Sequence, residues 1–158
     1  MIRILAFASL LLSAFAVPAA AGESPAAGYG PEVWPHVIAT ISLTKQEMDV
    51  FAETADYQQL TYKWKISTGR KGYETPTGDF KPIWADPDHH SSIYENAPMP
   101  FSVFFTEGGY AIHGTLEVAH LGHPVSHGCI RLDTPNAELF YDYVNKVGKE
   151  NTKIVIVN

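Results

Sequence analysis

A single cysteine with basic residues close by is the part of this sequence best suited to covalent chemistry. The cysteine is Cys129, in the stretch SHGCIRL that covers residues 126–132. A thiol attacks a carbonyl as its thiolate, so it needs a base or a lowered pKa. His127 lies two residues before the cysteine, and His113 lies upstream in the stretch IHGT. Either imidazole could accept the thiol proton, and the spacing does not choose between them.

The residues beside the cysteine predict groups that bind substrate. If this stretch is extended, side chains alternate between two faces, and His127, Cys129 and Arg131 share one of them. Gly128 permits close approach of the backbone, and nearby amides could form an oxyanion hole. The guanidinium of Arg131 could hold a substrate carboxylate in a bidentate pair. The alternatives for Arg131 are a solvated edge position or an ion pair with Asp133.

The first 21 residues have the pattern of a secretory signal peptide. Arg3 precedes an apolar run over residues 4–17, and small residues at 19–21 suit a cleavage site. The run is shorter than the about 20 residues that cross a bilayer, although an uncleaved anchor is the alternative. Exported cysteines usually pair, so a lone Cys129 is a free thiol, an intermolecular bridge or a buried inert residue. We expect an exported protein of the periplasm or cell envelope, without a stable membrane span after cleavage.

Composition limits the partners and the number of domains. The chain has 11 Lys and Arg against 17 Asp and Glu, a net charge of −6, and no basic run, which argues against a nucleic-acid partner. Residues 22–35 are rich in Gly, Pro, Ala and Ser and are predicted to be a flexible leader. The remainder, residues 36–158, is long enough for one domain with its own core.

Hydrophobic patterns predict a mainly β (α+β) domain, mostly antiparallel, with one helix late in the chain. Apolar residues with a period of two predict strands, and the clearest case places Leu60, Tyr62, Trp64 and Ile66 on one face. The predicted strands cover residues 37–43, 46–52, 60–67, 79–81, 101–106, 110–112 and 152–157. Two turn-rich segments interrupt them, residues 69–78 and a long irregular loop over residues 86–100.

The helix is predicted from its ends and its apolar face. Thr134 is the expected cap, Pro135 fits the first turn, and Gly148 ends the helix. The apolar residues with helical spacing are Ala137, Phe140, Tyr141 and Val144.

Two separated blocks in this sequence resemble the signature of the L,D-transpeptidase catalytic domain (YkuD-type). They are His113-Gly114-Thr115 and the stretch 126–132. Weaker similarity extends to residues 67–69 and 75–78, and the resemblance covers residues 36–158. It implies a β-sandwich-like fold and peptidoglycan cross-linking. The cysteine would attack the carbonyl of the third residue of a donor tetrapeptide stem and expel D-alanine. The resulting thioester would pass to a side-chain amine on an acceptor stem.

The resemblance also implies roles for individual residues, by motif position. Cys129 is the expected nucleophile, His113 the general base, and the carbonyl of Gly114 orients the imidazole. The residues expected to form the substrate and oxyanion site are Ser126, His127, Gly128 and Arg131, the last as a contact to a substrate carboxylate. Peptidoglycan stem peptides are the expected partners, and no cofactor or metal is expected.

Alternatives remain open at this point. The same thioester could be resolved by water, giving an L,D-carboxypeptidase, or by a free D-amino acid, giving exchange. A different class is a zinc site, because zinc favours His and Cys ligands. The candidate ligands are His89, His90, His113, His120, His123 and His127. A non-catalytic wall-binding module with the same fold is a further alternative.

Overall fold

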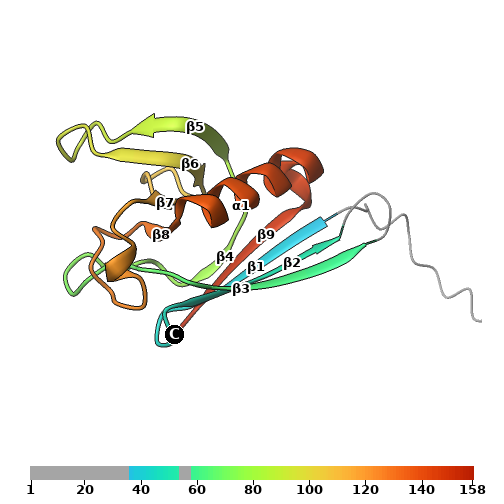
Figure 1. Cartoon of the computed structure of the whole chain (residues 1–158), viewed down its shortest axis with the longest axis horizontal. Helices are drawn as coiled ribbons and strands as arrows, with labels where there is room; N and C mark the ends of the chain where they lie inside the picture. The colour runs from blue at the N-terminus through green and yellow to red at the C-terminus, as the bar shows by residue number, and fades with distance from the viewer. Residues whose placement is uncertain (1–35, 54–57) are drawn as a thin grey trace, which may run out of the picture. The chain divides into compact units, whose positions relative to one another are not determined.

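Two β-sheets and one α-helix make up the part of the chain that the computed structural model describes, residues 36–53 and 58–158 (Figure 1). The mainly β fold with one late helix is therefore confirmed. The predicted signal peptide (1–21) and leader (22–35) lie outside the described residues. Within the described ranges, no helix is long and apolar enough to cross a bilayer.

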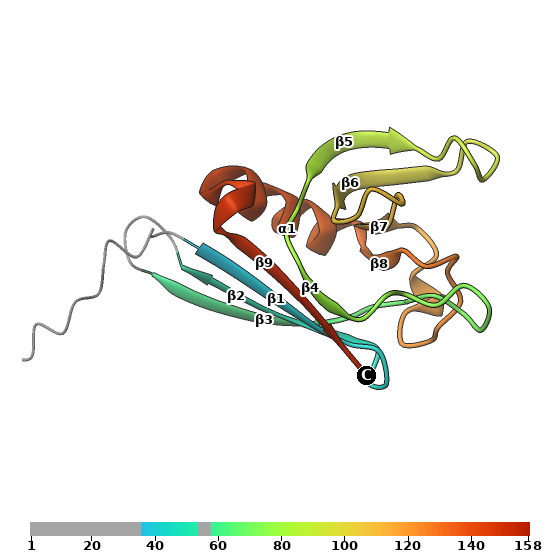
Figure 2. The same cartoon turned by 180° about the vertical axis from the view of Figure 1, so that it is seen from behind.

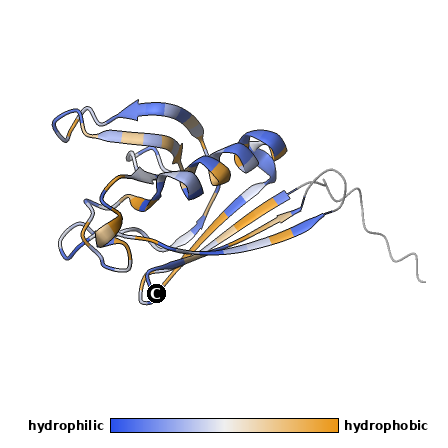
Figure 3. Cartoon of the chain, in the orientation of Figure 1, coloured by the Kyte–Doolittle hydropathy of each residue, from blue (hydrophilic) through white to orange (hydrophobic). Residues whose placement is uncertain are grey.

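The larger sheet has five strands in the order β3-β2-β1-β9-β4. Its strands are β1 (His36–Ser42), β2 (Glu47–Glu53), β3 (Gln59–Lys65), β4 (Gly78–Phe80) and β9 (Thr152–Val157). The pairing of β1 is antiparallel with β2 and parallel with β9. Alternate residues of β1, Val37, Ala39 and Ile41, are fully buried, as the period of two predicts. Figure 3 shows hydrophobic residues along the strands of this sheet.

The prediction for β3 is only partly right. Trp64 and Ile66 are buried, but Leu60 from the same predicted face is 36% exposed. Because β3 is the edge strand of the sheet, one of its sides has no neighbouring strand to cover it.

The smaller sheet has four strands in the order β5-β6-β7-β8. They are β5 (Trp84–His90), β6 (Pro98–Phe104), β7 (Ala111–Thr115) and β8 (Ile130–Asp133). The strands predicted at residues 101–106 and 110–112 correspond to β6 and β7, which pair antiparallel, whereas β7 and β8 are parallel. Figure 2 shows the chain passing from β4, at the edge of the larger sheet, to β5 of the smaller one.

The prediction of an irregular loop over residues 86–100 is wrong. Most of this segment belongs to β5 and β6, which pair with one another around a turn at residues 91–97. The prolines of this segment predict a loop, but Pro87 lies in the edge strand β5, where a missing N–H costs no ladder hydrogen bond. Pro98 and Pro100 lie in a part of β6 that pairs with β5 and not with β7. Pro87 of β5 and Phe101 of β6 are left out of the pairing register between the two strands. Phe101 has a positive φ of 55°.

The helix α1 (Thr134–Val147) starts and ends close to the predicted positions. Its N-cap is Asp133 rather than Thr134, and the side chain of Asp133 makes no capping hydrogen bond. Its buried residues are Ala137, Phe140, Tyr143, Val144 and Val147, whereas the predicted Tyr141 is half-buried. The helix packs against β1 and against strands of the smaller sheet, so its apolar face helps to close the core.

A segment after β3 joins the larger sheet to the cysteine-containing stretch. Backbone bridges pair Ser67 with Arg131 and Gly69 with Ser126. The buried side chain of Gln46 accepts from the N–H of Thr68 at 2.9 Å, and its amide lies 2.6 Å from the Thr68 hydroxyl. Residues 66–70 are therefore fixed on one side by the β1–β2 turn and on the other by the cysteine-containing stretch.

Candidate active site

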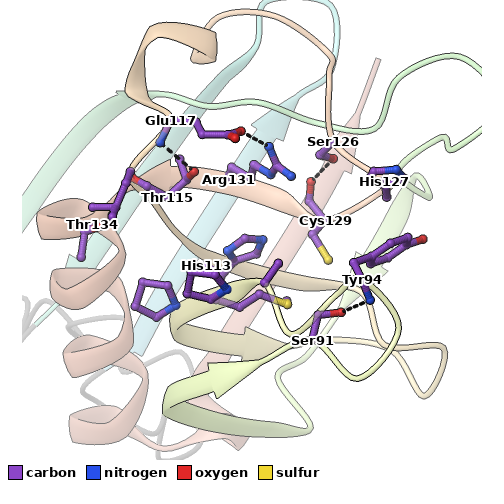
Figure 4. Close-up of a pocket in the computed structure, with 15 residues that line it drawn as sticks. Ser91, Tyr94, His113, Thr115, Glu117, Ser126, His127, Cys129, Arg131 and Thr134 are labelled. Atoms are coloured by element: carbon purple, nitrogen blue, oxygen red, sulfur yellow. Dashed lines mark hydrogen bonds and ion pairs between the residues drawn. The ribbon is translucent and has the colours of Figure 1, made fainter.

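The parallel pairing of β7 and β8 brings the two sequence blocks together. In this register His113 lies opposite Arg131, next to the end of the stretch that carries Cys129. The side chains of both blocks line a pocket of about 380 Å³ (Figure 4). Among its lining residues are His113, Glu117, Ser126, His127, Cys129 and Arg131.

His113 is buried and held in one orientation. Its side chain comes from the middle of β7 and the residue is 5% exposed. Nδ1–H donates to the carbonyl of Gly114 at 2.8 Å, which leaves the lone pair on Nε2 as the basic site. Burial lowers the pKa of His113 to about 4, partly opposed by the Gly114 carbonyl and aided by the charges of Arg131 and His89. The imidazole is therefore neutral at pH 7.

Gly114 lies in a tightly packed position. A side chain there would start 3.1–3.2 Å from Pro100 and from the backbone of Thr134. Because both neighbours belong to packed elements, even an alanine would push against the start of the helix. The glycine thus allows β7 to lie close to α1. Its carbonyl oxygen accepts the hydrogen bond from His113 Nδ1–H.

Cys129 is a free thiol in the wall of the same pocket. Burial raises the pKa of Cys129, while the N–H of Ala111 and the charge of Arg131 act in the opposite direction. The sulfur also lies 3.8 Å from the carbonyl oxygen of Gly109. In the free protein the pair is therefore a neutral thiol and a neutral imidazole rather than a preformed ion pair.

The stretch before β8 is a turn, so residues 126–129 do not meet the condition of an extended segment, under which alternate side chains would share one face. The strand begins at Ile130, and Gly128 has a φ of +114°. Ser126 Oγ accepts from the N–H of Gly128 at 3.1 Å and donates to the carbonyl of Cys129 at 2.6 Å. A Cβ at Gly128 would lie 2.5 Å from the ring of Tyr110. Backbone conformation and space therefore both require glycine here.

His127 lies at the rim of the pocket among aromatic and basic side chains. Arg70 Nη2 lies 2.7 Å from its Nε2 and, being a pure donor, donates to it. Tyr94 stacks on the imidazole with centroids 4.4 Å apart, and Tyr73 meets it edge-on at 4.9 Å. Partial loss of solvent and the charges of Arg70 and Arg131 lower the pKa of His127. Its Nε2 lone pair is thus occupied, which disfavours it as the base.

Arg131 faces the pocket but is already paired within the chain. Its Nη1 lies 2.9 Å from Glu117 Oε2, in the loop after β7. The sequence suggested Asp133 as the acidic alternative, and the structure shows Glu117 in that place. The positive charge of Arg131 lowers the pKa values of both His113 and Cys129. It therefore favours the thiolate and disfavours the imidazolium.

The other histidines have separate neighbours. His89 lies 3.3 Å from Asp86, His90 lies 3.2 Å from the carbonyl of Asp88, and His120 lies 3.5 Å from Glu117. Within residues 36–53 and 58–158, no three His, Cys, Asp or Glu side chains are grouped as metal ligands. The donor geometry thus gives the zinc alternative no support.

Four residues of the site were not predicted from the sequence, namely Gln46, Arg70, Thr75 and Tyr94. All four lie in loops distant in sequence from the cysteine-containing stretch. Arg70, Thr75 and Tyr94 contact that stretch directly. Gln46 contacts Thr68, in the segment that pairs with it. The weak similarity at residues 67–69 and 75–78 was the one signal that pointed to the loop holding Arg70 and Thr75.

Comparison with known proteins agrees with this architecture. Among curated protein sequences, none matches this chain. An L,D-transpeptidase from Mycobacterium tuberculosis has a TM-score of 0.67 at 22% identity, with 78% of this chain and 58% of that chain covered. L,D-transpeptidase 3 from the same organism, in complex with a faropenem-derived adduct, has a TM-score of 0.65 at 20% identity, with 78% and 61% covered.

A third solved structure has higher identity. The L,D-transpeptidase from Xylanimonas cellulosilytica is 26% identical with a TM-score of 0.59, and 80% of this chain and 63% of that chain are covered. This chain thus spans about three fifths of the length of these solved chains. The sequence profile of the L,D-transpeptidase catalytic domain (YkuD) matches residues 36–156, most of the chain. This chain therefore belongs to the L,D-transpeptidase catalytic domain family.

Proposed function

We propose that this protein is an exported cysteine acyltransferase that joins peptidoglycan stem peptides by L,D-transpeptidation. The observation that carries the proposal is the meeting of Cys129 and His113 in one pocket, with His113 Nδ1 bound to the Gly114 carbonyl. This arrangement leaves Nε2 free to take a proton from the thiol. The signal-like segment 1–21 supports export, and family membership supports the substrate class.

The first half of the reaction forms the thioester. The Cys129 thiol gives its proton to His113 Nε2 as the sulfur bonds to the carbonyl carbon of the third stem residue. The carbonyl electron pair moves onto oxygen, and a tetrahedral oxyanion forms. When the carbonyl re-forms, the bond to D-alanine breaks, and the leaving amine takes the proton from His113. Because thiol and imidazole are neutral in the free protein, His113 acts as a general base during attack.

The second half releases the product. An acceptor amine attacks the thioester carbon and gives its proton to His113 Nε2. When the tetrahedral intermediate collapses, the carbon–sulfur bond breaks and Cys129 recovers the proton. Water or a free D-amino acid in place of the acceptor amine would give carboxypeptidase or exchange products instead. The steps on the protein are the same in all three cases.

The test of this proposal is formation of a covalent acyl adduct on the thiol. A carbapenem contains a strained amide, so the wild-type protein should gain one carbapenem mass in intact-mass spectrometry. Peptide mapping should place it on Cys129, the single cysteine of the chain. A Cys129→Ala protein should gain no mass. No adduct on folded wild-type protein, or an adduct at another residue, would rule out the acyl-transfer site.

A second measurement defines the reaction. Purified protein is incubated with a tetrapeptide stem donor and an amine-bearing acceptor stem, and the products are identified by mass. A cross-linked dimer with release of D-alanine is expected. A tripeptide alone would assign the carboxypeptidase reaction, and incorporation of an added D-amino acid would assign exchange. A protein that binds peptidoglycan but forms none of these products would favour the non-catalytic wall-binding module.

A further inference from the structure

Thr75 is a buried residue that contacts the cysteine-containing turn outside the pocket. It is 4% exposed and does not line the pocket. Its hydroxyl oxygen accepts from the N–H of Gly69 at 2.9 Å and lies 2.7 Å from the carbonyl oxygen of Gly128. A carbonyl oxygen only accepts, so the Thr75 hydroxyl proton is donated to Gly128. The direction of this hydrogen bond is therefore settled by both of its partners.

The hydrogen bond fixes one peptide plane, the one that joins Gly128 to Cys129. In a trans peptide the C=O and the N–H point in opposite directions. Holding the Gly128 carbonyl toward Thr75 therefore directs the N–H of Cys129 away from Thr75. Without this contact the plane could rotate easily, because Gly128 has a φ of +114° and no side chain to restrict it.

The other backbone groups of the turn already have partners. The N–H of Gly128 donates to Ser126 Oγ, and the carbonyl of Cys129 accepts from the same hydroxyl. In the part of the chain that the structure describes, no protein group accepts from the N–H of Cys129. Of the amides at Gly128 and Cys129, the one available to an incoming oxyanion is thus that of Cys129.

We propose that Thr75 is a positioning residue that holds the Cys129 N–H in the direction needed to bind the oxyanion of the tetrahedral intermediate. The inference rests on the proposed acyl-transfer function. It assigns Thr75 a contribution to the acylation step without any contact to substrate. Since Thr75 does not line the pocket, its loss should change the rate of acylation and leave substrate binding unchanged.

Two reactions of the same thiol separate positioning from general structure. Carbapenem acylation passes through an oxyanion, whereas iodoacetamide alkylation displaces iodide at a methylene carbon and builds no charge on a carbonyl oxygen. Thr75→Val keeps the shape of the side chain and removes its hydrogen bonds. Thr75→Ser keeps the hydroxyl. Thr77→Val, at an exposed position of the same loop, is the matched control.

The expected result is selective loss of acylation. Loss of an oxyanion donor costs about 10²–10³-fold in rate, and misdirection of one should cost roughly 10- to 100-fold. Thr75→Val should lose that factor in the acylation rate constant, with unchanged half-saturating carbapenem concentration and unchanged alkylation rate. Thr75→Ser and Thr77→Val should both acylate within about threefold of wild type, since each retains the hydrogen bonds of residue 75.

Several outcomes would overturn the inference. Equal losses in acylation and alkylation would make Thr75 a general support of the turn, as would a Thr75→Val protein that does not fold. A Thr75→Ser protein as slow as Thr75→Val would show that the hydroxyl is not the cause. If the wild type is acylated and Thr75→Val is acylated equally fast, this inference alone is overturned and the proposed function stands. A wild-type protein that forms no adduct removes the proposed function and this inference with it.

Discussion

Glu117 Oε2 lies 2.9 Å from Arg131 Nη1, so the guanidinium at the pocket already holds a carboxylate of its own chain (Figure 4). The side chain of Glu117 is 60% exposed and that of Arg131 is 23% exposed. Ion pairs of such exposure contribute about 0–1 kcal/mol, which a bidentate partner can exceed. A substrate carboxylate can therefore displace Glu117 at little cost.

Replacement of Arg131 should mainly affect donors that carry the recognised carboxylate. Hydrogen bonds to charged groups are worth about 1.5–3 kcal/mol, so Arg131→Ala should lower kcat/KM for such a donor by roughly 10- to 100-fold. The measurement compares that donor with the same peptide amidated at the carboxylate. Amidation should cost the wild type much more than it costs Arg131→Ala. Equal costs in the two proteins would show that Arg131 does not bind this group.

Removal of Glu117 should have the opposite effect on substrate binding. Glu117→Gln takes away the competing charge, so KM for the carboxylated donor should fall by about two- to fivefold. KM for the amidated donor should be unchanged. A rise in KM for the carboxylated donor would instead mean that Glu117 serves to orient Arg131.

The reactivity of the free thiol should reflect its raised pKa. Burial disfavours the thiolate of Cys129, so iodoacetamide should react slowly at pH 7 and faster through the alkaline range. The midpoint should lie above that of a small-molecule thiol measured in parallel. Arg131→Ala should move the midpoint further up, because the positive charge of Arg131 lowers the pKa of Cys129. A midpoint below the ordinary thiol value would indicate a preformed thiolate.

The strands and the helix could largely be predicted, because their apolar residues recur with the period of the element. In β1 alternate residues are fully buried, and in α1 the buried residues share one face. The β5–β6 hairpin was missed because Pro87, Pro98 and Pro100 are loop signals in sequence. Pro87 is compatible with a strand because β5 is at the sheet edge, and Pro98 and Pro100 because that part of β6 pairs only with β5. Both are properties of the assembled sheet.

The candidate site could be predicted where its residues are close in sequence or belong to a recognisable pair of blocks. The contacts of Arg70 with His127 and of Thr75 with Gly128 could not, since each joins positions more than 50 apart. Such pairs depend on how the loop after β3 crosses the cysteine-containing turn. The close approach of the Tyr110 ring to Gly128 is likewise a contact between distant positions that the local sequence does not show.

The two histidines should differ in their contribution to acylation. Loss of a general base costs about 10²–10⁴-fold, and we expect this for His113→Gln in single-turnover acylation. His127→Gln should cost less, because its Nε2 already accepts from Arg70 and does not take the thiol proton. Both variants should be compared at saturating carbapenem, so that binding effects are excluded. Equal or reversed losses would reassign the base.

The burial of His113 should also make the fold sensitive to acid. Its pKa is lowered to about 4, from an ordinary value of 6.5 that the unfolded chain retains. Between these values the unfolded state binds more protons, so this contribution to stability is complete above pH 6.5 and is lost as pH falls toward 4. At 1.36 kcal/mol per unit, the contribution is about 3 kcal/mol.

Urea unfolding at pH 7, 5.5 and 4, followed by tryptophan fluorescence, measures this effect. In His113→Gln the fall in unfolding free energy from pH 7 to pH 4 should be smaller than in wild type by about 3 kcal/mol. His120→Gln changes an exposed histidine and should fall as the wild type does. Comparison of the three proteins removes the contribution of the carboxylates, which titrate in all of them. Parallel curves for His113→Gln and wild type would show that His113 is not held neutral in the fold.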